Sequence, residues 1–239
     1  MDKYEVTILM PCLNEEHAIG YSIGEAKAYI GKSGISAEIL VADNGSTDSS
    51  CEIARSMGAR VVHIEEKGYG NALRGGIAQA KGRNIIMGDA DGSYDFSNLD
   101  IFIEKLREGY TLVMGNRYLG GIECGAMPPL HQYLGVPVLS WLGRKKYHTE
   151  IGDFHCGLRA FHTEKAKELG LKSGGMEFAT EIIGAFAKAD ERICEVPVVL
   201  RKDRRCGKSH LRTVRDGMRH VRLIPVSYTH LRAHETLAN

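Results

Sequence analysis

Two aspartates separated by one residue, Asp89 and Asp91, are the side chains whose type and spacing point most directly to chemistry. They follow an apolar run at residues 84–88 that is typical of a buried strand, and alternation along extended backbone places both carboxylates on one edge. Carboxylates this close repel each other unless a cation or hydrogen bonds hold them, and hard oxygen ligands suit Mg²⁺ or Mn²⁺. The pattern therefore predicts a divalent metal site, and such a metal typically binds a diphosphate.

Length and composition predict one α/β domain. With 239 residues, of which 43% are hydrophobic, the chain can bury a sizeable core, and its net charge of +1 gives no reason to expect a nucleic-acid partner. The sequence shows neither a basic leader nor a run approaching the roughly eighteen apolar residues of a membrane span, so we expect no signal peptide. The six cysteines form no C-x-x-C pair, which favours reduced thiols in a cytosolic domain.

Strand-like and helix-like patterns alternate along the first half of the chain, which predicts an α/β fold with a mostly parallel, Rossmann-like sheet flanked by helices. Strands are expected at residues 6–10, 38–42, 60–64, 84–88 and 111–115, and helices at residues 15–30, 48–57, 70–80 and 98–108. Ligands bind at the carboxyl ends of parallel strands. One rim should therefore gather Pro11, Asn14, Asp43, Asp89 and Asp91. The less regular second half should complete the site within the same domain.

Two common nucleotide-binding loops do not match the sequence. A Rossmann dinucleotide site needs G-x-G-x-x-G directly after the first strand, whereas this chain has Pro-Cys-Leu-Asn-Glu at residues 11–15. Residues 207–209 read Gly-Lys-Ser like the end of a P-loop, but the required upstream glycine position holds Lys202 and no buried strand precedes it. A basic turn is therefore favoured at residues 207–209.

Four short segments, in their order and spacing, carry a resemblance to a known family. They are Pro-Cys-Leu-Asn-Glu at 11–15, Val-Ala-Asp-Asn-Gly-Ser-Thr-Asp at 41–48, Lys-Gly-Tyr-Gly-Asn-Ala at 67–72 and Asp-Ala-Asp at 89–91. Over roughly residues 4–224 the chain resembles the family 2 glycosyltransferases of GT-A fold, and within them the polyprenyl-phosphate sugar transferases, the dolichyl-phosphate mannose or glucose synthase group. Further matches include Met-Gly-Asn-Arg-Tyr at 114–118, Gly-Asp-Phe-His-Cys-Gly-Leu-Arg-Ala-Phe at 152–161 and Glu-Val-Pro at 195–197.

The resemblance implies an inverting hexosyltransferase with a UDP- or GDP-linked sugar donor and a dolichyl or undecaprenyl phosphate acceptor, at the cytoplasmic face of the membrane. It also implies a GT-A domain at residues 1–225, with a nucleotide-sugar (donor) half at 1–116, an acceptor half at 117–200 and a basic amphipathic segment at 201–225. Two alternatives stay open. One is a family 2 transferase that acts on a polysaccharide or soluble acceptor, and the other is a catalytically silent GT-A binding module.

On the donor side, a divalent ion would stabilise the charge that develops on the leaving diphosphate. Asp91 is the expected direct metal ligand, and Asp89 shares the metal or binds the ribose. The further residues expected to bind the nucleotide sugar are Pro11, Asn14, Glu15, Asp43, Lys67 and Gly70. Helix capping is the alternative for Asn14 and the preferred role of Asp48, and a simple turn is the alternative for residues 67–70.

On the acceptor side, a phosphate monoester has a second pKa of about 6 and is largely ionised at neutral pH, so capturing the anion matters more than removing a proton. The expected phosphate ligands are Arg117, Arg159, Arg201, Lys208 and Ser209, with Arg117 and Lys208 favoured by similarity. Asp153 resembles the family's proposed general base and would orient or deprotonate the nucleophile. Its alternative is a loop aspartate bonded to backbone amides, and Glu177 is interpreted as structural.

Residues 201–222 are strongly basic, with nine Lys or Arg against two Asp. Apolar residues recur among them at helical spacing, which predicts an amphipathic helix suited to an anionic membrane surface. A solvated helix packed on the domain is the alternative, and the lack of aromatic residues argues against nucleic acid. Residues 226–239 resemble translated read-through of a sequencing adapter and are interpreted as a non-native tail. This implies a truncated gene product, many of whose relatives continue into membrane spans.

Overall fold

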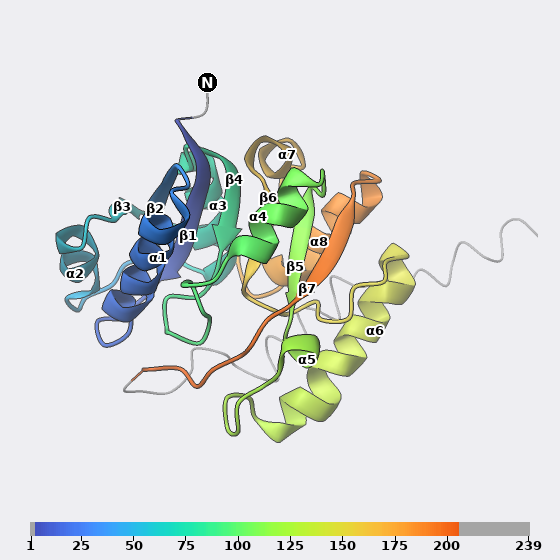
Figure 1. Cartoon of the computed structure of the whole chain (residues 1–239). Helices are drawn as coiled ribbons and strands as arrows, with labels where there is room; N and C mark the ends of the chain where they lie inside the picture. Colours follow the sequence, from blue (N-terminus) through green and yellow to red (C-terminus); the bar gives the residue numbers. More distant parts are fainter. Residues whose placement is uncertain (1–2, 206–239) are drawn as a thin grey trace, which may run out of the picture.

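A seven-stranded sheet forms the centre of the computed structural model, which describes residues 3–205 (Figure 1). The strands are β1 (Tyr4–Cys12), β2 (Ala37–Asp43), β3 (Arg60–His63), β4 (Gly82–Met87), β5 (Leu112–Asn116), β6 (Arg159–His162) and β7 (Ile193–Pro197). Their order in the sheet is β3-β2-β1-β4-β6-β5-β7. Only β6 runs antiparallel to its neighbours, β4 and β5, so the described sheet is mostly parallel, as predicted.

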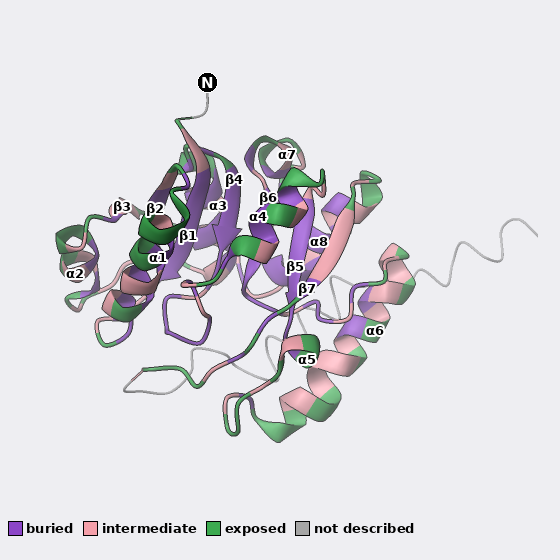
Figure 2. Cartoon of the chain, viewed as in Figure 1, coloured by how far each residue is buried: buried purple, intermediate pink, exposed green. Residues whose placement is uncertain are grey.

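Helices cover both faces of the sheet. They are α1 (Ile19–Ser33), α2 (Ser50–Ser56), α3 (Tyr69–Gln79), α4 (Asp100–Arg107), α5 (Arg117–Gly120), the π-helix η1 (His131–Gly135), α6 (Val136–Tyr147), α7 (Thr163–Glu168) and α8 (Phe178–Lys188). Neighbouring residues of β1 point to opposite cores, since Ile8 packs with Ile23 of α1 and Leu9 packs with Leu73 of α3. Figure 2 shows the sheet buried between helices whose outer sides are exposed. Within residues 3–205, no helix is long and apolar enough to cross a membrane.

The carboxyl ends of β1, β2 and β4 meet at one rim of the sheet, where the sequence predicts donor binding, and we term it the donor rim. In the parallel register, Cys12 lies opposite Asp43, and Leu9 lies opposite Met87. The loops that follow these three strands therefore leave the sheet on the same side. The rim that the strand pattern predicts is present, and it brings together residues from three separate segments.

All nine elements expected in the first half are present, with boundaries that shift by a few residues. The largest shift is at the first helix, which begins at Ile19 instead of residue 15. Asn14 has a left-handed φ of 56°, and its backbone N–H donates to the hydroxyl of Ser46. The chain must therefore turn at Asn14 before a right-handed helix can begin.

Candidate active site

Three carboxylates, Glu15, Asp89 and Asp91, lie near one another on the donor rim. Asp89 Oδ1 accepts a hydrogen bond from the Tyr69 hydroxyl (3.0 Å), and Asp91 Oδ1 accepts from the backbone N–H and hydroxyl of Ser93 (3.0 and 2.6 Å). Burial, with the neighbouring Asp91, raises the pKa of Asp89 to about 6, and burial raises the pKa of Glu15 to about 7. The rim thus concentrates negative charge that a cation would stabilise.

One cation already lies among these carboxylates, the guanidinium of Arg205. Its Nε lies 2.8 Å from Glu15 Oε1, and its Nη2 lies 2.8 Å from Asp91 Oδ2. The sequence pattern placed Arg205 in a surface helix and missed this contact, because Arg205 and Glu15 are 190 positions apart. Carboxylate oxygens gathered around a positive group are the ligands that Mg²⁺ and Mn²⁺ prefer, so the residues present fit a divalent cation.

Asp43 ends β2 at the same rim and is almost fully buried. Its carboxylate accepts hydrogen bonds from the backbone N–H groups of Gly45 (3.2 Å) and Ser46 (3.0 Å), and His63 Nδ1 lies 2.9 Å from Oδ2. Burial raises the pKa of Asp43, but these hydrogen bonds outweigh burial and lower the pKa to about 2. The ionised carboxylate therefore shapes the turn after β2. His63 was not predicted, although its place at the end of the third strand is the signal that would have found it.

Asn14 and Asp48 join the loops that follow β1 and β2. Asn14 Oδ1 accepts from the backbone N–H of Thr47 (2.8 Å), and Asn14 is not the residue that precedes α1. Asp48 accepts from the backbone N–H of Ser50 with one oxygen (3.0 Å) and from that of Glu16 with the other (3.1 Å). Asp48 thus accepts from the first N–H of α2, although Ser49 is the residue that directly precedes this helix, and Ala18 holds that position before α1. Neither Asn14 nor Asp48 therefore occupies the capping position that the sequence offered for it.

Lys67, Gly70 and Pro11 all make structural contacts. Lys67 Nζ donates to the backbone carbonyl of Asn44 (2.8 Å). Gly70 packs so closely on a neighbouring loop that a side-chain carbon there would lie 2.2 Å from the carbonyl oxygen of Ser173. Pro11 is buried within β1. These contacts explain the residue types without a ligand, and a nucleotide contact for the three stays a prediction.

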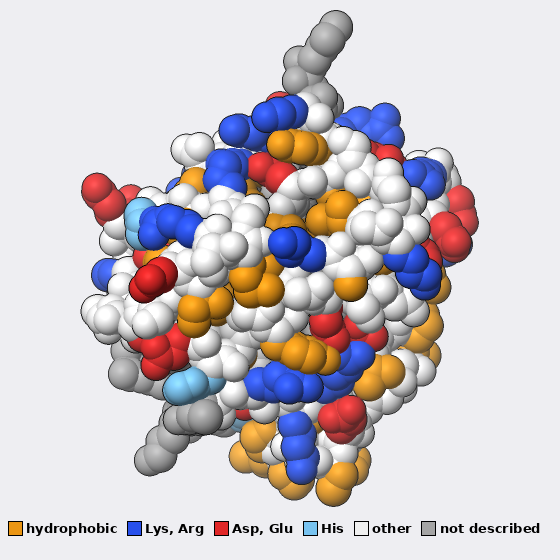
Figure 3. All heavy atoms as spheres, turned by 60° about the vertical axis from the view of Figure 1, so that its left-hand side comes forward, with side chains coloured by type: hydrophobic (Ala, Val, Ile, Leu, Met, Phe, Trp, Pro, Cys, Tyr) orange, Lys and Arg blue, Asp and Glu red, His pale blue; other side chains and the backbone are white. Residues whose placement is uncertain are grey.

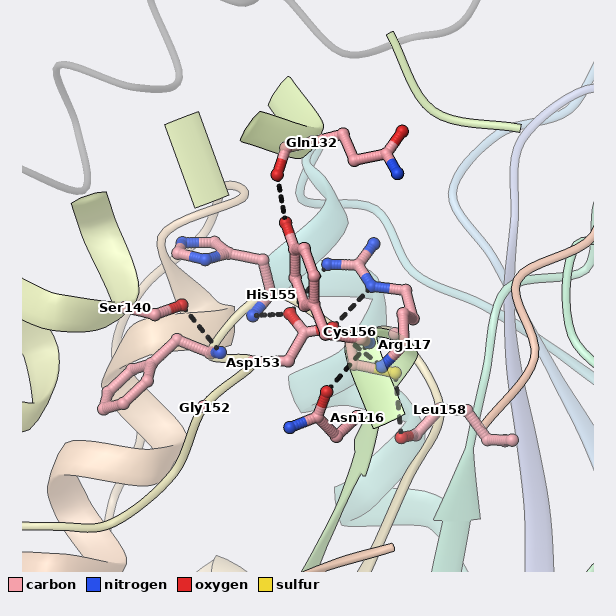
Figure 4. Close-up of polar contacts among 12 residues, drawn as sticks. Asn116, Arg117, Gln132, Ser140, Gly152, Asp153, His155, Cys156 and Leu158 are labelled. Atoms are coloured by element: carbon pink, nitrogen blue, oxygen red, sulfur yellow. Dashed lines mark hydrogen bonds and ion pairs between the residues drawn. The ribbon is translucent and has the colours of Figure 1, made fainter. Parts of the chain in front are cut away.

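A buried ion pair lies at the end of β5, in the half predicted to bind the acceptor (Figure 4). Asp153 Oδ2 lies 2.7 Å from Arg117 Nε, Asp153 Oδ1 lies 2.8 Å from Arg117 Nη2, and the backbone N–H of Arg117 also donates to Oδ2. Burial raises the pKa of Asp153, but Arg117 outweighs burial and holds that pKa below the ordinary aspartate value. The sequence assigned both residues to the acceptor, Arg117 to its phosphate and Asp153 to the nucleophile, whereas here they bind each other. A carboxylate paired in this way is a weak base.

Glu195 fixes the loop that carries Asp153. Its Oε1 accepts from the backbone N–H groups of Gly152 (2.7 Å) and Asp153 (3.0 Å), and from the side-chain amide of Asn116 (3.1 Å). Asn116 Oδ1 in turn accepts from the backbone N–H of Tyr118 (2.9 Å) and caps α5. Segments that are far apart in the sequence thus build one frame around the ion pair.

Arg159, predicted to contact the acceptor phosphate, is instead part of the core. Its side chain on β6 is 1% exposed and donates to the backbone carbonyls of Cys156 and Ala179. The guanidinium would have to leave these carbonyls to reach a substrate, so its burial does not fit a phosphate contact. Glu177 accepts from the backbone N–H of Gly175 (3.2 Å), which agrees with a structural role.

Arg201, also predicted to contact the acceptor phosphate, lies on the donor side. It forms ion pairs with Glu25 (2.7 Å) and Asp95 (2.6 Å). Both acidic partners lie within residues 1–116, the half predicted to bind the donor, so Arg201 is engaged away from Asp153. Lys208, Ser209, the predicted basic helix beyond residue 205 and the tail at 226–239 lie outside the described residues.

Comparison with known proteins identifies the family. The glycosyl transferase family 2 model matches residues 7–170. The chain belongs to this family. It is 38% identical over 223 residues to the low-salt glycan biosynthesis hexosyltransferase Agl6 of Haloferax volcanii. The matched region covers 93% of this chain but only 53% of that protein. It is also 29% identical over 208 residues to a dolichyl-phosphate hexose transferase of the same organism. This match covers 87% of this chain and 86% of that protein.

Solved glycosyltransferase structures share the fold. Glucosyl-3-phosphoglycerate synthase from Mycobacterium tuberculosis, crystallised with Mn²⁺, UDP and phosphoglyceric acid, matches with a TM-score of 0.67 at 23% identity. The match covers 85% of this chain and 72% of that one. It confirms the GT-A architecture that the family resemblance implies.

Proposed function

We propose that this family 2 glycosyltransferase moves a hexose, with inversion, from a UDP- or GDP-linked sugar to a polyprenyl phosphate such as dolichyl or undecaprenyl phosphate. The protein would act peripherally, at the cytoplasmic face of the membrane. A relative named dolichyl-phosphate hexose transferase and solved neighbours crystallised with UDP support the two substrate classes. The described residues support them in three places: the donor rim, the buried ion pair and the surface beside it.

The carboxylates of the donor rim support the nucleotide-sugar site. Asp91, with Asp89 beside it, would hold Mg²⁺ or Mn²⁺, which when bound supplies positive charge to the leaving diphosphate. Asp43 at the end of β2 and Glu15 after β1 belong to the same rim and would contact the nucleoside portion of the donor. The tight hydrogen bonding of Asp43 keeps its carboxylate ionised and fixed in position for that contact.

The buried ion pair supports capture of an ionised acceptor. Asp153 engages Nε and Nη2 of Arg117, whereas Nη1 makes no hydrogen bond within residues 3–205. We assign Nη1 to a phosphate oxygen of the acceptor, since guanidinium groups bind phosphate through charge-assisted hydrogen bonds. Because the phosphate is already ionised at neutral pH, its oxygen needs little help from a base. Asp153 would then position Arg117 rather than remove a proton.

The observation that carries the lipid acceptor is a group of exposed apolar side chains beside this ion pair. Tyr133 is 75% exposed, Leu119 is 65% exposed and Trp141 is 51% exposed. We define the apolar surface as Leu119, Leu130, Tyr133, Leu134, Val138 and Trp141, on α5, η1, α6 and the residue before η1. Figure 3 shows hydrophobic side chains gathered at the lower end of the molecule, the level at which α6 begins in Figure 1, with Lys and Arg side chains directly above.

The apolar surface is physically joined to the ion pair. Helix α5 begins with Arg117 itself, and the hydroxyl of the next residue, Tyr118, donates to the backbone carbonyl of Gln132 in η1 (2.8 Å). Residues 144–146 at the end of α6 read Arg-Lys-Lys, and Glu123 is the one acidic residue from 118 to 147. Apolar, aromatic and basic side chains in this combination suit the interface of an anionic membrane. A polyprenyl chain lying there would bring its phosphate to Arg117.

The experiment is a transfer assay with a panel of radiolabelled UDP- and GDP-linked hexoses, polyprenyl phosphate in detergent, and Mg²⁺ or Mn²⁺. The proposal expects label in lipid that organic solvent extracts, and no label there when EDTA is present. Label that enters only a polysaccharide or a soluble acceptor such as phosphoglyceric acid would favour the soluble-acceptor alternative. A protein that binds donors but turns over none would be a binding module.

A further inference from the structure

Residues 201–205, which we term the strap, lie across the donor rim. Two backbone hydrogen bonds attach them to the loop after β4. The N–H of Arg201 donates to the carbonyl of Ser93 (2.9 Å), and the N–H of Arg204 donates to the carbonyl of Asp91 (2.8 Å). The strap is therefore bonded to the backbone of the expected metal ligand.

The side chains of Arg201 and Arg204 fasten the strap to the donor half. Arg201 pairs with Glu25 on α1 (2.7 Å) and with Asp95 (2.6 Å). The guanidinium carbon of Arg204 lies 3.6 Å from the ring centre of Tyr21, which is also on α1. These contacts involve none of the three rim carboxylates, so they can hold the strap near the site whether or not the rim binds a ligand.

Arg205, the last residue of the strap, occupies the carboxylates themselves. Its side chain is 17% exposed, its Nη2 lies 2.8 Å from Asp91 Oδ2, and its Nε lies 2.8 Å from Glu15 Oε1. The other oxygen of Asp91 already accepts two hydrogen bonds from Ser93. A guanidinium and a divalent ion at one oxygen would repel each other strongly in a partly buried site. Arg205 and a metal ion must therefore compete for Asp91 Oδ2.

We propose that Arg205 is an exchangeable counterion, which neutralises Glu15 and Asp91 in the metal-free enzyme and withdraws before Mg²⁺ or Mn²⁺ binds Asp91. Because the N–H of Arg204 is bonded to the carbonyl of Asp91, withdrawal of the neighbouring Arg205 weakens this hydrogen bond, while the side chains of Arg201 and Arg204 keep the strap attached to the donor half. Metal binding is thereby coupled to opening of the donor rim. This inference rests on the metal-dependent donor site proposed above and is independent of the acceptor.

The test is Mn²⁺ binding without nucleotide, measured from the electron paramagnetic resonance signal of the free ion, in the wild type, Arg205→Gln and Lys202→Gln. Lys202 belongs to the strap and carries the same charge, but its side chain is exposed and forms no ion pair within residues 3–205. Arg205→Gln removes the competing charge-assisted hydrogen bonds, so it should bind Mn²⁺ about tenfold to a hundredfold more tightly. Lys202→Gln should stay within about twofold of the wild type.

Hydrogen exchange supplies a second readout, and Asp91→Asn separates this inference from the proposed function. Adding Mn²⁺ to the wild type should speed exchange of the Arg204 amide, whose hydrogen bond to Asp91 loosens, and should have no such effect in Asp91→Asn. Equal Mn²⁺ affinity in Arg205→Gln and the wild type, with no binding by Asp91→Asn, would overturn the role of Arg205 and leave the metal site standing. No Mn²⁺ binding by either the wild type or Arg205→Gln would overturn both.

Discussion

The two halves of the molecule each hold an arginine bound to carboxylates. The two contacts differ in how deeply they are buried and in how many hydrogen bonds fix the surrounding loop. In the acceptor half, the side chains of Arg117 and Asp153 are 9% and 0% exposed, and Glu195 fixes the loop around them. In the half predicted to bind the donor, the side chain of Arg205 is 17% exposed, those of Glu15 and Asp91 are 5% and 10% exposed, and Arg205 lies beyond the last strand of the sheet. The same chemical groups can therefore form a permanent element in one site and an exchangeable one in the other.

Burial decides what the loss of each contact should change. Removing one partner of a buried pair leaves an uncompensated charge in the protein interior, which costs about 3–5 kcal/mol of stability. Arg205 is more exposed than Arg117, so its guanidinium can turn to water and leave the rim carboxylates to an incoming cation at lower cost. Substitutions in the acceptor pair should therefore alter the free energy of unfolding, whereas substitutions on the donor rim should alter ligand binding and turnover.

The largest effect on turnover is expected from Asp91→Asn. An amide cannot replace a charged metal ligand, so kcat should fall at least about a hundredfold while the melting temperature stays close to that of the wild type. Asp190→Asn is the matched control, because Asp190 is exposed and its left-handed backbone, with φ of 56°, suits asparagine equally well. Near-normal turnover by Asp91→Asn, or full wild-type activity in EDTA, would contradict a metal-dependent donor site.

Asp153→Asn should instead lower stability. The substitution leaves the Arg117 guanidinium buried without its counter-charge, so the free energy of unfolding should fall by about 3 kcal/mol in a urea titration. Unchanged stability would show that the pair does not form in solution.

The pH dependence of the wild type checks the same pair. Because Arg117 holds the pKa of Asp153 below its unfolded value of about 3.9, the stability that the carboxylate contributes is fully present above that value. It is lost only as pH falls through the lower folded pKa. At saturating Mn²⁺, which favours the ionised form of the rim carboxylates Asp89 and Asp91, kcat between pH 5 and pH 8 should therefore follow the second ionisation of the acceptor phosphate, near about pH 6, instead of Asp153. The check is to compare acceptor phosphates that differ in their second pKa. If the midpoint of the kcat profile stays the same for all of them, Asp153 would again be the candidate base.

Arg117→Lys should separate the two substrates. Lysine keeps the positive charge but loses the fork that binds Asp153 and the phosphate together, so the KM for polyprenyl phosphate should rise about tenfold. The KM for the sugar donor should stay within about twofold. A rise in the donor KM without a rise in the acceptor KM would move Arg117 to the donor site.

The smallest effect is expected on the apolar surface, from Leu134→Glu. A carboxylate there opposes both burial in lipid and contact with anionic headgroups, so the partition constant for anionic vesicles should fall about tenfold. Trp141, the one tryptophan of the chain, reports binding through a shift of its fluorescence to shorter wavelength. Val199→Glu is the control, since Val199 is exposed but lies after β7, outside the apolar surface. Equal vesicle binding by Leu134→Glu and the wild type would show that the apolar surface does not bind the membrane.

The sequence predicted the donor rim better than the ion pairs because strand patterns are local. Apolar runs located the ends of β2 and β4, and parallel pairing then placed Asp43, Asp89 and Asp91 on one side of the sheet. No local pattern encodes which cation meets which carboxylate, and Arg117 reaches Asp153 across 36 positions of the chain. The antiparallel strand β6 creates a further long-range effect, because it draws Arg159 into the core, where its place in the motif at residues 153–160 had suggested a substrate contact.

The most direct test of the lipid acceptor offers two acceptors to one enzyme. The wild type, a radiolabelled sugar donor that it turns over and Mn²⁺ are mixed with anionic vesicles that contain polyprenyl phosphate, in the presence of equimolar phosphoglyceric acid. The proposed function predicts that the label moves to the organic phase as a glycosylated polyprenyl phosphate. Label that stays in the aqueous phase as glycosylated phosphoglyceric acid, with none in the lipid, would contradict it.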